Sequence, residues 1–382
     1  MHDVLAGHVE RGEVPGLVSL VSRRGDVHVD SIGAKSLGGD PIGRDTIFRI
    51  ASMSKPITAA ATMILVEECK LRLDEPVDRL LPELANRKVL RSLESAPDDT
   101  VPASRPITVR DLLTFRMGFG MIPASPGTYP IQRSIEELGL SSGPPAPGGE
   151  PGPEEWMRRL GSLPLLYQPG EHWLYHIPSE VLGVLIARAS EQPFDSFLSE
   201  RIFDRLGMKD TGFHVPSARL DSLATSYITD DETGALSIHD EPAGGRWSRP
   251  PAFPSGGGGL VSTADDYLAF AQMMLDGGKH GNVRILSRPS VELMTTDHLT
   301  AEQRAQTFAG FGWGFGMRVV ARRNQAMSVG TYGWDGGLGT TWNNDPREEL
   351  IIILLTQASF TSPQLPKVCL DFRTLAYAAI DD

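Results

Sequence analysis

Cysteine is scarce in this chain, with only Cys69 and Cys369 among 382 residues. A disulfide framework needs several cysteines in a short chain, so we expect two buried thiols rather than a bridge. Long apolar runs are also missing: the longest, 57–66 and 350–355, fall well short of the ~20 residues that cross a bilayer. The first residues lack the basic stretch and apolar core of a secretory signal. We therefore expect a soluble, cytoplasmic protein with no membrane partner.

Basic residues are fewer than acidic residues in this chain. Lys and Arg number 36 against 48 Asp and Glu, which gives a formal net charge of −12. This balance, without any Lys/Arg-rich stripe, argues against a nucleic-acid partner. It is also weak evidence against strongly anionic substrates. The composition, 40% hydrophobic and 22% charged, is that of an ordinary globular protein.

Several common catalytic signatures are missing. The chain has no Gly-x-Ser-x-Gly elbow and no His-Glu-x-x-His, which removes the usual α/β-hydrolase and zinc-protease patterns. The glycine run 256–259 lacks the Gly-Lys-Ser/Thr of a phosphate loop. His172 and His176 have i, i+4 spacing, but no further ligand stands near them. We expect neither a metal nor a cofactor.

The order of predicted elements indicates the fold. Alternating β-branched residues predict a hairpin over 16–34 and an extended run over 46–51. From Lys55 onward, apolar residues at helical spacing predict a buried helix. Further helices are expected over 109–115, 154–160, 179–189, 194–206 and 264–275, and strands over 312–320, 326–332, 339–342 and 350–356.

Strands, then helices, then strands predict an α+β fold. We expect an antiparallel sheet formed from both chain ends, flanked by helices, with a mostly helical insertion. The whole chain, 1–382, would be one domain, with an α/β subdomain at about 1–75 and 225–382 and a helical subdomain at about 76–224. Residues 122–153, dense in Pro, Gly and Ser, predict a long irregular loop, either functional or a plain surface excursion.

Ser52 and Lys55 are the first candidates for chemistry. On a helix, residues i and i+3 share a face, so the Lys55 amine would lie near the Ser52 hydroxyl. A serine alcohol needs an adjacent base, and a buried lysine can serve as one. Ser-x-x-Lys alone is a weak signal, but here the serine opens an apolar helix, whose free N–H groups favour a developing anion.

The segment 48–58 resembles the nucleophile segment of the serine β-lactamase and penicillin-binding-protein superfamily. The resemblance is closest to the class C branch and its family VIII carboxylesterases, and it extends over almost the whole chain. Similar stretches are 71–77, 107–114 and the glycine-rich 256–266. The resemblance implies a β-lactamase/transpeptidase-like fold with Ser52 as nucleophile and Lys55 beside it.

The second family element is Trp173-Leu174-Tyr175. The resemblance implies that Tyr175 is catalytic; a buried structural tyrosine is the alternative. In β-lactamases an asparagine that binds the substrate amide usually stands two places on, where this chain has Ile177. His176 between them is either a neighbour that tunes Tyr175 or a plain pocket-wall residue.

The third family element is a strand that carries Lys-Thr-Gly in β-lactamases. Here Trp334-Asp335-Gly336 stands in that place, where esterase-like members commonly have Trp-Gly-Gly. The resemblance implies an aromatic wall at Trp334 instead of a cation, and an oxyanion hole from the N–H groups of Ser52 and Gly337. Asp335 departs even from the esterase pattern.

These residues predict a serine hydrolase that acts on a small-molecule ester through an acyl-Ser52 intermediate. Ser52, Lys55 and Tyr175 would be catalytic, and Trp334, Asp335, Gly336, Ile177 and His176 would bind substrate. Three alternatives stay open: a β-lactamase or D-amino peptidase, an acyltransferase, and a non-catalytic ligand-binding protein. Which of Lys55 and Tyr175 is the resting base stays open too, as do the acyl group, the alcohol and the oligomeric state.

Overall fold

A computed structural model describes residues 1–140, 146–323 and 326–382 of the chain. Its main feature is a seven-stranded antiparallel sheet. In spatial order the strands are β11 (Gly312–Trp313), β12 (Arg318–Val319), β13 (Tyr332–Gly336), β14 (Thr340–Asp345), β15 (Leu350–Thr356), β1 (Gly16–Arg23) and β2 (Asp26–Gly33).

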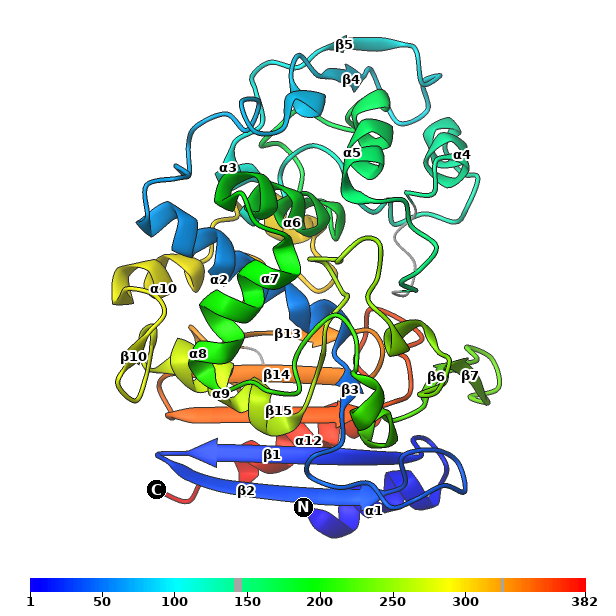
Figure 1. Ribbon diagram of the computed structural model, residues 1–382, viewed down its shortest axis with the longest axis vertical. Helices are drawn as coiled ribbons and strands as arrows, with labels where there is room; N and C mark the ends of the chain where they lie inside the picture. The colour runs from blue at the N-terminus through cyan, green and yellow to red at the C-terminus, as the bar shows by residue number, and fades with distance from the viewer. Residues whose placement is uncertain (141–145, 324–325) are drawn as a thin grey trace.

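The two ends of the chain meet in the middle of this sheet. Strand β1 pairs along its length with β15, from Leu17 opposite Thr356 to Arg23 opposite Leu350. Figure 1 shows the N-terminal strands in blue directly beside the C-terminal strands in orange. The predicted antiparallel sheet from both chain ends is therefore confirmed.

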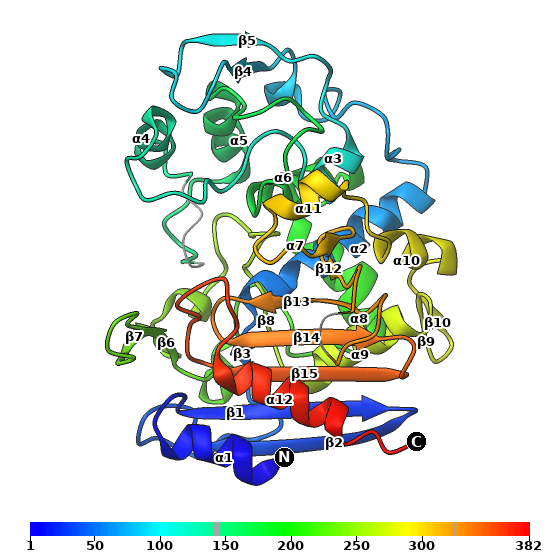
Figure 2. The same ribbon diagram turned by 180° about the vertical axis from the view of Figure 1, so that it is seen from behind.

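Helices cover both faces of the sheet. All seven residues of β15 are buried, as expected for a strand that is covered on two sides. Helices α1 (His2–Glu10) and α12 (Lys367–Ala378) lie over one face (Figure 2). Helix α9 (Ala264–Leu275) lies over the other face, in front of the sheet in Figure 1.

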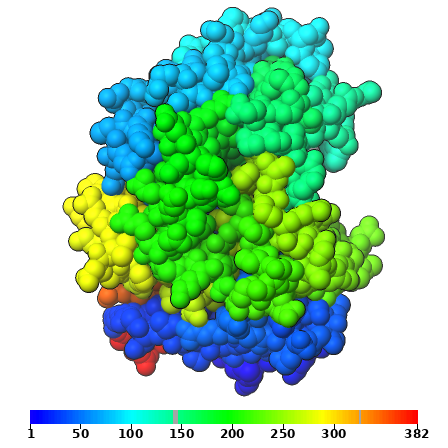
Figure 3. Space-filling model, in the orientation of Figure 1, coloured from blue at the N-terminus to red at the C-terminus, as the bar shows by residue number. Residues whose placement is uncertain are grey.

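The remaining helices form a layer beyond β13, at the top of Figure 1. Helix α2 (Ser54–Glu67) joins this layer to the sheet, and its residues are buried from Ser54 to Leu65. On the face shown in Figure 3, the blue N-terminal strands form one end and the cyan-to-green helical segments the other. The layer contains α3 (Val109–Leu113), α4 (Pro130–Glu137), α5 (Pro153–Ser162) and α6 (Ile177–Ser190). From this layer α7 (Phe194–Leu198), a π-helical turn (Ser199–Phe203) and α8 (Asp204–Leu206) lead back to α9 beside the sheet.

Shorter elements connect these layers. Two more helices follow α9, namely α10 (Arg288–Met294) and α11 (Ala301–Gln306). The two-stranded sheets pair β3 (Phe48–Arg49) with β8 (Val261–Ser262), β4 (Lys88–Leu90) with β5 (Thr100–Pro102), β6 (Ser226–Thr229) with β7 (Leu236–Asp240), and β9 (Lys279–His280) with β10 (Val283–Arg284).

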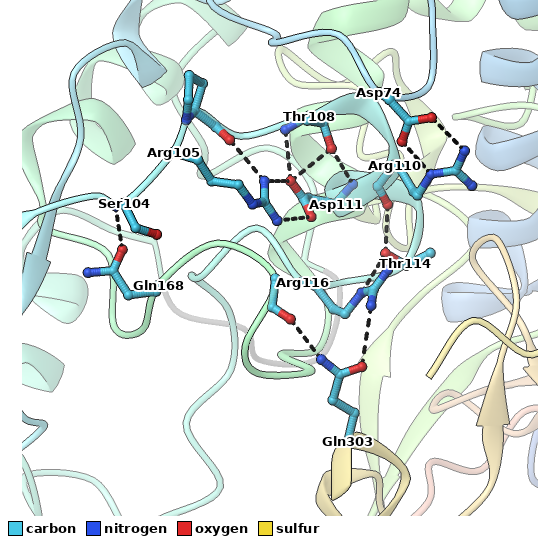
Figure 4. Close-up of polar contacts among 12 residues, drawn as sticks. Asp74, Ser104, Arg105, Thr108, Arg110, Asp111, Thr114, Arg116, Gln168 and Gln303 are labelled. Atoms are coloured by element: carbon cyan, nitrogen blue, oxygen red, sulfur yellow. Dashed lines mark hydrogen bonds and ion pairs between the residues drawn. The ribbon is translucent and has the colours of Figure 1, made fainter. Parts of the chain in front are cut away.

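A polar network fixes the start of α3 and links it to α11 (Figure 4). Thr108 caps α3 in a capping box with Asp111, and Arg105 forms two hydrogen bonds with the same carboxylate, at 2.6 and 2.8 Å. Arg116, just after α3, donates to Gln303 of α11 at 3.3 Å. Gln303 in turn donates to the Gly170 carbonyl at 2.7 Å. This network therefore anchors the segment that leads to Tyr175.

Several local predictions were wrong. The predicted loop 122–153 contains helix α4, which starts with proline at its first turn and a capping glutamine, Gln132; its residues 141–145 lie outside the described residues. The predicted strand 312–320 folds back on itself as β11 and β12, because Gly316 takes a positive φ of 71° in the turn between them.

The predicted strand 326–332 was misplaced as well. Only Tyr332 is in a strand, because the preceding residues form a turn around Gly330 (φ 91°), in which Thr331 N–H donates to the Ser328 carbonyl. The N-terminal helix α1 was missed. The two cysteines are unbridged as expected, but Cys69 is exposed and only Cys369 is buried.

Among the described residues, no helix has the length and apolar character needed to cross a bilayer. The division into an α/β and a helical subdomain at residues 76 and 224 stays a prediction.

Candidate active site

Ser52 lies in a tight turn between a strand and a buried helix. The 3₁₀ turn Ala51–Met53 follows β3 and leads directly into α2. Ala51 adopts a positive φ of 44°, which is uncommon for a residue with a side chain and often marks functional turns. The Thr340 hydroxyl of β14 donates to the Ile50 carbonyl at 3.1 Å. The sheet thus fixes the turn, and Ser52 lies one turn before α2 rather than within it.

Lys55 is fully buried on the first turn of α2. Its Nζ lies 2.9 Å from Ser52 Oγ, as the i, i+3 spacing predicts. The same Nζ contacts the Gly257 carbonyl and lies 3.2 Å from His176 Nδ1. Burial lowers the pKa of Lys55 to about 7, although the negative charge of Glu180 opposes the shift. A large fraction of Lys55 is therefore a neutral amine near neutral pH.

Tyr175 also contacts the Lys55 amine, through the face of its ring. Its ring centre is 4.6 Å from Lys55 Nζ, and its hydroxyl oxygen accepts a hydrogen bond of 2.7 Å from Trp334 Nε1. Burial raises the pKa of the phenol well above its ordinary value, against hydrogen bonds with Ser52 and Trp334 that lower it. Tyr175 is thus protonated at neutral pH.

The aromatic residues around Tyr175 form a rigid wall. Phe115, Trp173 and Trp313 pack with Tyr175 and Trp334 in one buried cluster. The Trp313 and Trp334 rings meet edge to face with centroids 4.7 Å apart, a favourable geometry for aromatic pairs. These contacts hold the phenol and the indole in place beside Ser52.

His176 contacts Lys55, and Glu180 contacts His176. Helix α6 begins just after His176, so His176 and Glu180 are i, i+4 neighbours, and His176 Nε2 lies 3.1 Å from Glu180 Oε1. Ser255 Oγ donates to the same carboxylate oxygen at 2.6 Å. His176 was expected either to tune Tyr175 or to lie on the pocket wall and bind substrate; Glu180, Ser255 and Gly257 were not expected at the site. A carboxylate four residues beyond His176, in the buried first part of helix α6, was the available signal.

Gly337 and Gly336 have different surroundings. Gly337 lines the cavity next to Ser52, and a Cβ built on it would meet nothing within 4 Å. Its carbonyl accepts from Phe360 N–H at 2.8 Å; in the described part of the chain its own N–H donates no hydrogen bond. A Cβ on Gly336 would lie 2.2 Å from the Ile50 carbonyl oxygen. Gly336 is thus a packing position beneath the Ser52 turn.

Two other predicted substrate-binding residues, Ile177 and Asp335, differ in their position relative to Ser52. Ile177 is buried in the main core and lines a separate cavity of about 270 Å³, so the structure does not bring it to Ser52. Asp335 lies on the lining of the same cavity as Ser52, but it alternates with Trp334 on β13, so its side chain points to the other face of the sheet. Its carboxylate pairs with Arg318 at 2.7 Å and with Arg373 at 3.7 Å. The charges of both arginines hold its pKa low despite burial, which would raise it.

A large cavity opens over Ser52. It measures about 1750 Å³, and Ser52, Tyr175, His176, Trp334 and Gly337 lie on its lining. Phe308, Phe311 and Met121 add apolar surface. Across the described ranges, no group of three or more His, Cys, Asp or Glu could hold a metal ion. The arrangement offers a hydroxyl, a neutral amine, a phenol and backbone N–H groups beside a partly apolar space.

Comparison with known proteins identifies the family. Residues 1–367 match the family described as Beta-lactamase. An uncharacterized Mycobacterium tuberculosis protein is 39% identical over 91% of this chain and 87% of its own length. Esterase EstB of Burkholderia gladioli is 30% identical over 95% of this chain and 91% of its own length.

Solved structures agree with this match. EstCE1, described as a hydrolase with promiscuous acyltransferase activity, superposes with a TM-score of 0.83 at 28% identity, over 98% of this chain and 97% of that one. The predicted antiparallel sheet with flanking helices is thus the fold of these proteins, and the chain belongs to the beta-lactamase family.

Proposed function

We propose that the protein is a serine hydrolase that cleaves carboxylic esters through an acyl-Ser52 intermediate. The observation that carries the proposal is the buried Lys55 amine, 2.9 Å from Ser52 Oγ and with its pKa lowered to about 7. A neutral amine at this distance can take the serine proton. The descriptions of two similar proteins, an esterase and a hydrolase with acyltransferase activity, support the same chemistry.

The first half of the reaction forms the acyl-enzyme. Lys55 takes the Ser52 proton while Ser52 Oγ attacks the ester carbonyl carbon. The N–H groups of Ser52 and Gly337 stabilise the oxyanion. As the tetrahedral intermediate collapses, Tyr175 gives its proton to the leaving alkoxide and regains one from Lys55.

The second half releases the acid. A water molecule gives a proton to the Lys55–Tyr175 pair and attacks the acyl carbonyl, and Ser52 then leaves with a proton. The high pKa of Tyr175 and the low pKa of Lys55 favour the amine as the resting base. The two groups still titrate as a coupled pair.

Esters suit the site better than β-lactams. Trp334 stands where β-lactamases carry a lysine, so this position itself supplies no cation for a substrate carboxylate. The nearby Arg318, 5.8 Å from the centre of the Trp334 ring, is already paired with Asp335. Ile177, in the place of the amide-binding asparagine, is buried in the core. A β-lactamase or D-amino peptidase is therefore the weaker candidate. Nitrocefin turnover at a rate comparable with ester hydrolysis would reverse this order.

Acyl transfer to an alcohol or amine is the second candidate. The same acyl-enzyme can react with either acceptor, and the cavity of about 1750 Å³ has room for one beside the acyl group. Product analysis with added alcohols or amines separates transfer from hydrolysis. A non-catalytic role is disfavoured by the retained Ser52, Lys55 and Tyr175, and failure of a fluorophosphonate probe to label the protein would support it.

The decisive test of hydrolysis is Ser52→Ala with a panel of p-nitrophenyl esters of increasing acyl length. We expect loss of turnover and of covalent labelling by a fluorophosphonate, because the variant has no nucleophile. Serine-independent turnover would contradict the proposal. A small-molecule ester as partner and a cytoplasmic location stay predictions.

A further inference from the structure

Three polar atoms surround the amine of Lys55. They are Ser52 Oγ at 2.9 Å, His176 Nδ1 at 3.2 Å and the Gly257 carbonyl oxygen. A neutral amine has two N–H hydrogens and one lone pair. It serves as a base toward Ser52 only when the lone pair, rather than a hydrogen, faces the serine hydroxyl.

The partners of the amine decide how it is oriented. The Gly257 carbonyl can only accept a hydrogen bond. The ionised Glu180 can only accept as well, so His176 Nε2, 3.1 Å from Glu180 Oε1, must carry the imidazole hydrogen. His176 Nδ1 is then an acceptor. The two N–H groups of Lys55 are directed to Gly257 and His176, and its lone pair is left for Ser52.

We propose that His176 and Glu180 are positioning residues: Glu180 fixes the imidazole tautomer, and His176 fixes the Lys55 amine with its lone pair toward Ser52. The inference rests on the proposed function and adds two residues to it. Neither residue needs to touch substrate to act, because each acts through Lys55.

The protonation states around the amine agree with this arrangement. Burial lowers the pKa of His176, and the nearby Lys55 charge adds to the shift against the opposing effect of Glu180. Burial would raise the pKa of Glu180, but its contacts with His176, Ser255 and Lys55 bring it below the ordinary value. The described groups that face Lys55 and His176 are Glu180 of α6, the Ser255 hydroxyl beside it, Tyr175 and Ser52.

The backbone is shaped around this contact. His176 has φ 78° and ψ −67°, and Ile177 N–H donates to the Tyr175 carbonyl at 3.2 Å, which defines a strained γ-turn. The turn allows consecutive residues, Tyr175 and His176, both to reach one amine. A Cβ on Gly257 would lie 2.5 Å from Glu180 Oε1 and 3.1 Å from His176 Cε1. Because residue 257 is a glycine, there is room for the side chains of His176 and Glu180.

The first test is Glu180→Gln, which keeps size and hydrogen bonding. The new amide can donate to His176 Nε2, so the other tautomer, with hydrogen on Nδ1, becomes accessible and cannot accept from Lys55. We expect kcat/KM for a p-nitrophenyl ester to fall at least about tenfold through kcat, with KM little changed. The carboxylate charge that raises the pKa of Lys55 is also gone. The acidic limb of the pH–rate profile, recorded over about pH 5 to 9, should therefore move to lower pH.

The second test compares two variants at position 176. His176→Phe removes the acceptor and should be at least about tenfold slower. His176→Asn keeps an oxygen acceptor near the place of Nδ1 and should recover part of that loss. His172→Asn is the matched control, since His172 stacks on Tyr167 with ring centroids 3.7 Å apart, away from Lys55, and should leave activity unchanged.

Two results would overturn the positioning role. One is a kcat/KM and an acidic limb in Glu180→Gln equal to those of the unaltered enzyme. The other is an equal loss in His176→Asn and His176→Phe. Thermal unfolding of each variant identifies losses due to misfolding, which Glu180→Gln, of nearly equal volume, is chosen to avoid. Ser52→Ala separates the two proposals: if it stays active, the proposed function fails, and if it is inactive while these variants are unaffected, only the positioning role fails.

Discussion

Arg49 and Lys55 are two buried cationic side chains on either side of Ser52, and they differ in their partners. Arg49 donates to Asp240, a carboxylate that is itself buried, and to the Ala224 carbonyl. Among the residues that the structure describes, Lys55 contacts no carboxylate and faces a hydroxyl, an imidazole and a carbonyl. Burial lowers the pKa of both groups.

The difference shows how one segment can hold a structural ion and a base six residues apart. A guanidinium stays protonated in proteins and, beside Asp240, forms an ion pair that fixes the strand entering the Ser52 turn. An amine without an anionic contact loses its proton much more easily when buried. The partner, rather than burial, therefore decides the role. Glu180 contacts His176, which in turn contacts Lys55, and among the described residues Glu180 forms no ion pair with Lys55.

The largest effect is expected from Lys55→Met, which removes the proposed base. We expect kcat/KM to fall on the order of 10⁴-fold, about 5.5 kcal/mol in activation free energy. Stability should change little, because loss of a costly buried amine offsets the two acceptors left without a donor. Ester hydrolysis and thermal unfolding measure the two quantities. Retention of more than a tenth of the activity would show that Lys55 is not the base.

Arg49→Met should lower stability and leave most of the activity, the reverse of the effect expected for Lys55→Met. It leaves Asp240 buried without its cation, so we expect the free energy of unfolding to fall by about 3 kcal/mol. The folded fraction should keep most of its activity per active site, as titrated with a fluorophosphonate. Urea unfolding gives the stability, and the double variant Arg49→Met with Asp240→Leu should recover part of the loss. Normal stability in the single variant would contradict the view of Arg49 as a structural ion.

A smaller effect that distinguishes Lys55 from Arg49 is the pH dependence of the free energy of unfolding. The pKa of Lys55 is about 7 in the folded protein, against an ordinary value of 10.5. Between these values the unfolded chain binds one proton more than the folded chain, so this lysine makes stability rise with pH; below about pH 7 its burial cost is fully present. The unaltered protein should therefore gain stability relative to Lys55→Met as the pH rises. Its free energy of unfolding minus that of the variant should increase by roughly 2 kcal/mol from about pH 7 to pH 9.

The matched measurement is the same comparison with Arg49→Met. Both the folded and the unfolded guanidinium stay protonated throughout this range, so that difference should be flat with pH. Equal slopes for the two variants would show that the pKa of Lys55 is not lowered by its surroundings.

Local patterns and the family resemblance were enough to predict where the central side chains lie. Strand β15 has the bounds expected from its apolar run, Leu350–Thr356, and the Ser52–Lys55 contact follows from helical spacing. Tyr175 and Gly337 lie beside Ser52 as the family resemblance implied. The strand and the Ser52–Lys55 contact each depend on a short segment whose backbone the sequence determines, whereas Tyr175 and Gly337 are far from Ser52 in sequence and were placed by the resemblance alone.

Contacts between distant segments could not be predicted in the same way. Gly257 and Ser255 reach the site only because the glycine-rich turn packs against α2 and α6. Asp335 turned out to be an ion-pair partner of Arg318 and Arg373, which come from another strand and from the last helix. Ile177 was placed at the site by its nearness to Tyr175 in sequence, but the γ-turn at His176 directs it into the core.

The hydrogen bond from Trp334 to Tyr175 has a consequence of its own. An indole N–H donates and cannot accept, so the phenol oxygen is the acceptor of this contact and its hydrogen must point elsewhere, with Ser52 as its neighbour. Ser52 is thereby placed between a lone pair on Lys55 and a hydrogen on Tyr175. The two sides of the serine oxygen are therefore not interchangeable, and in the proposed mechanism protons move in one direction, from the serine to the amine and from the phenol to the departing alcohol.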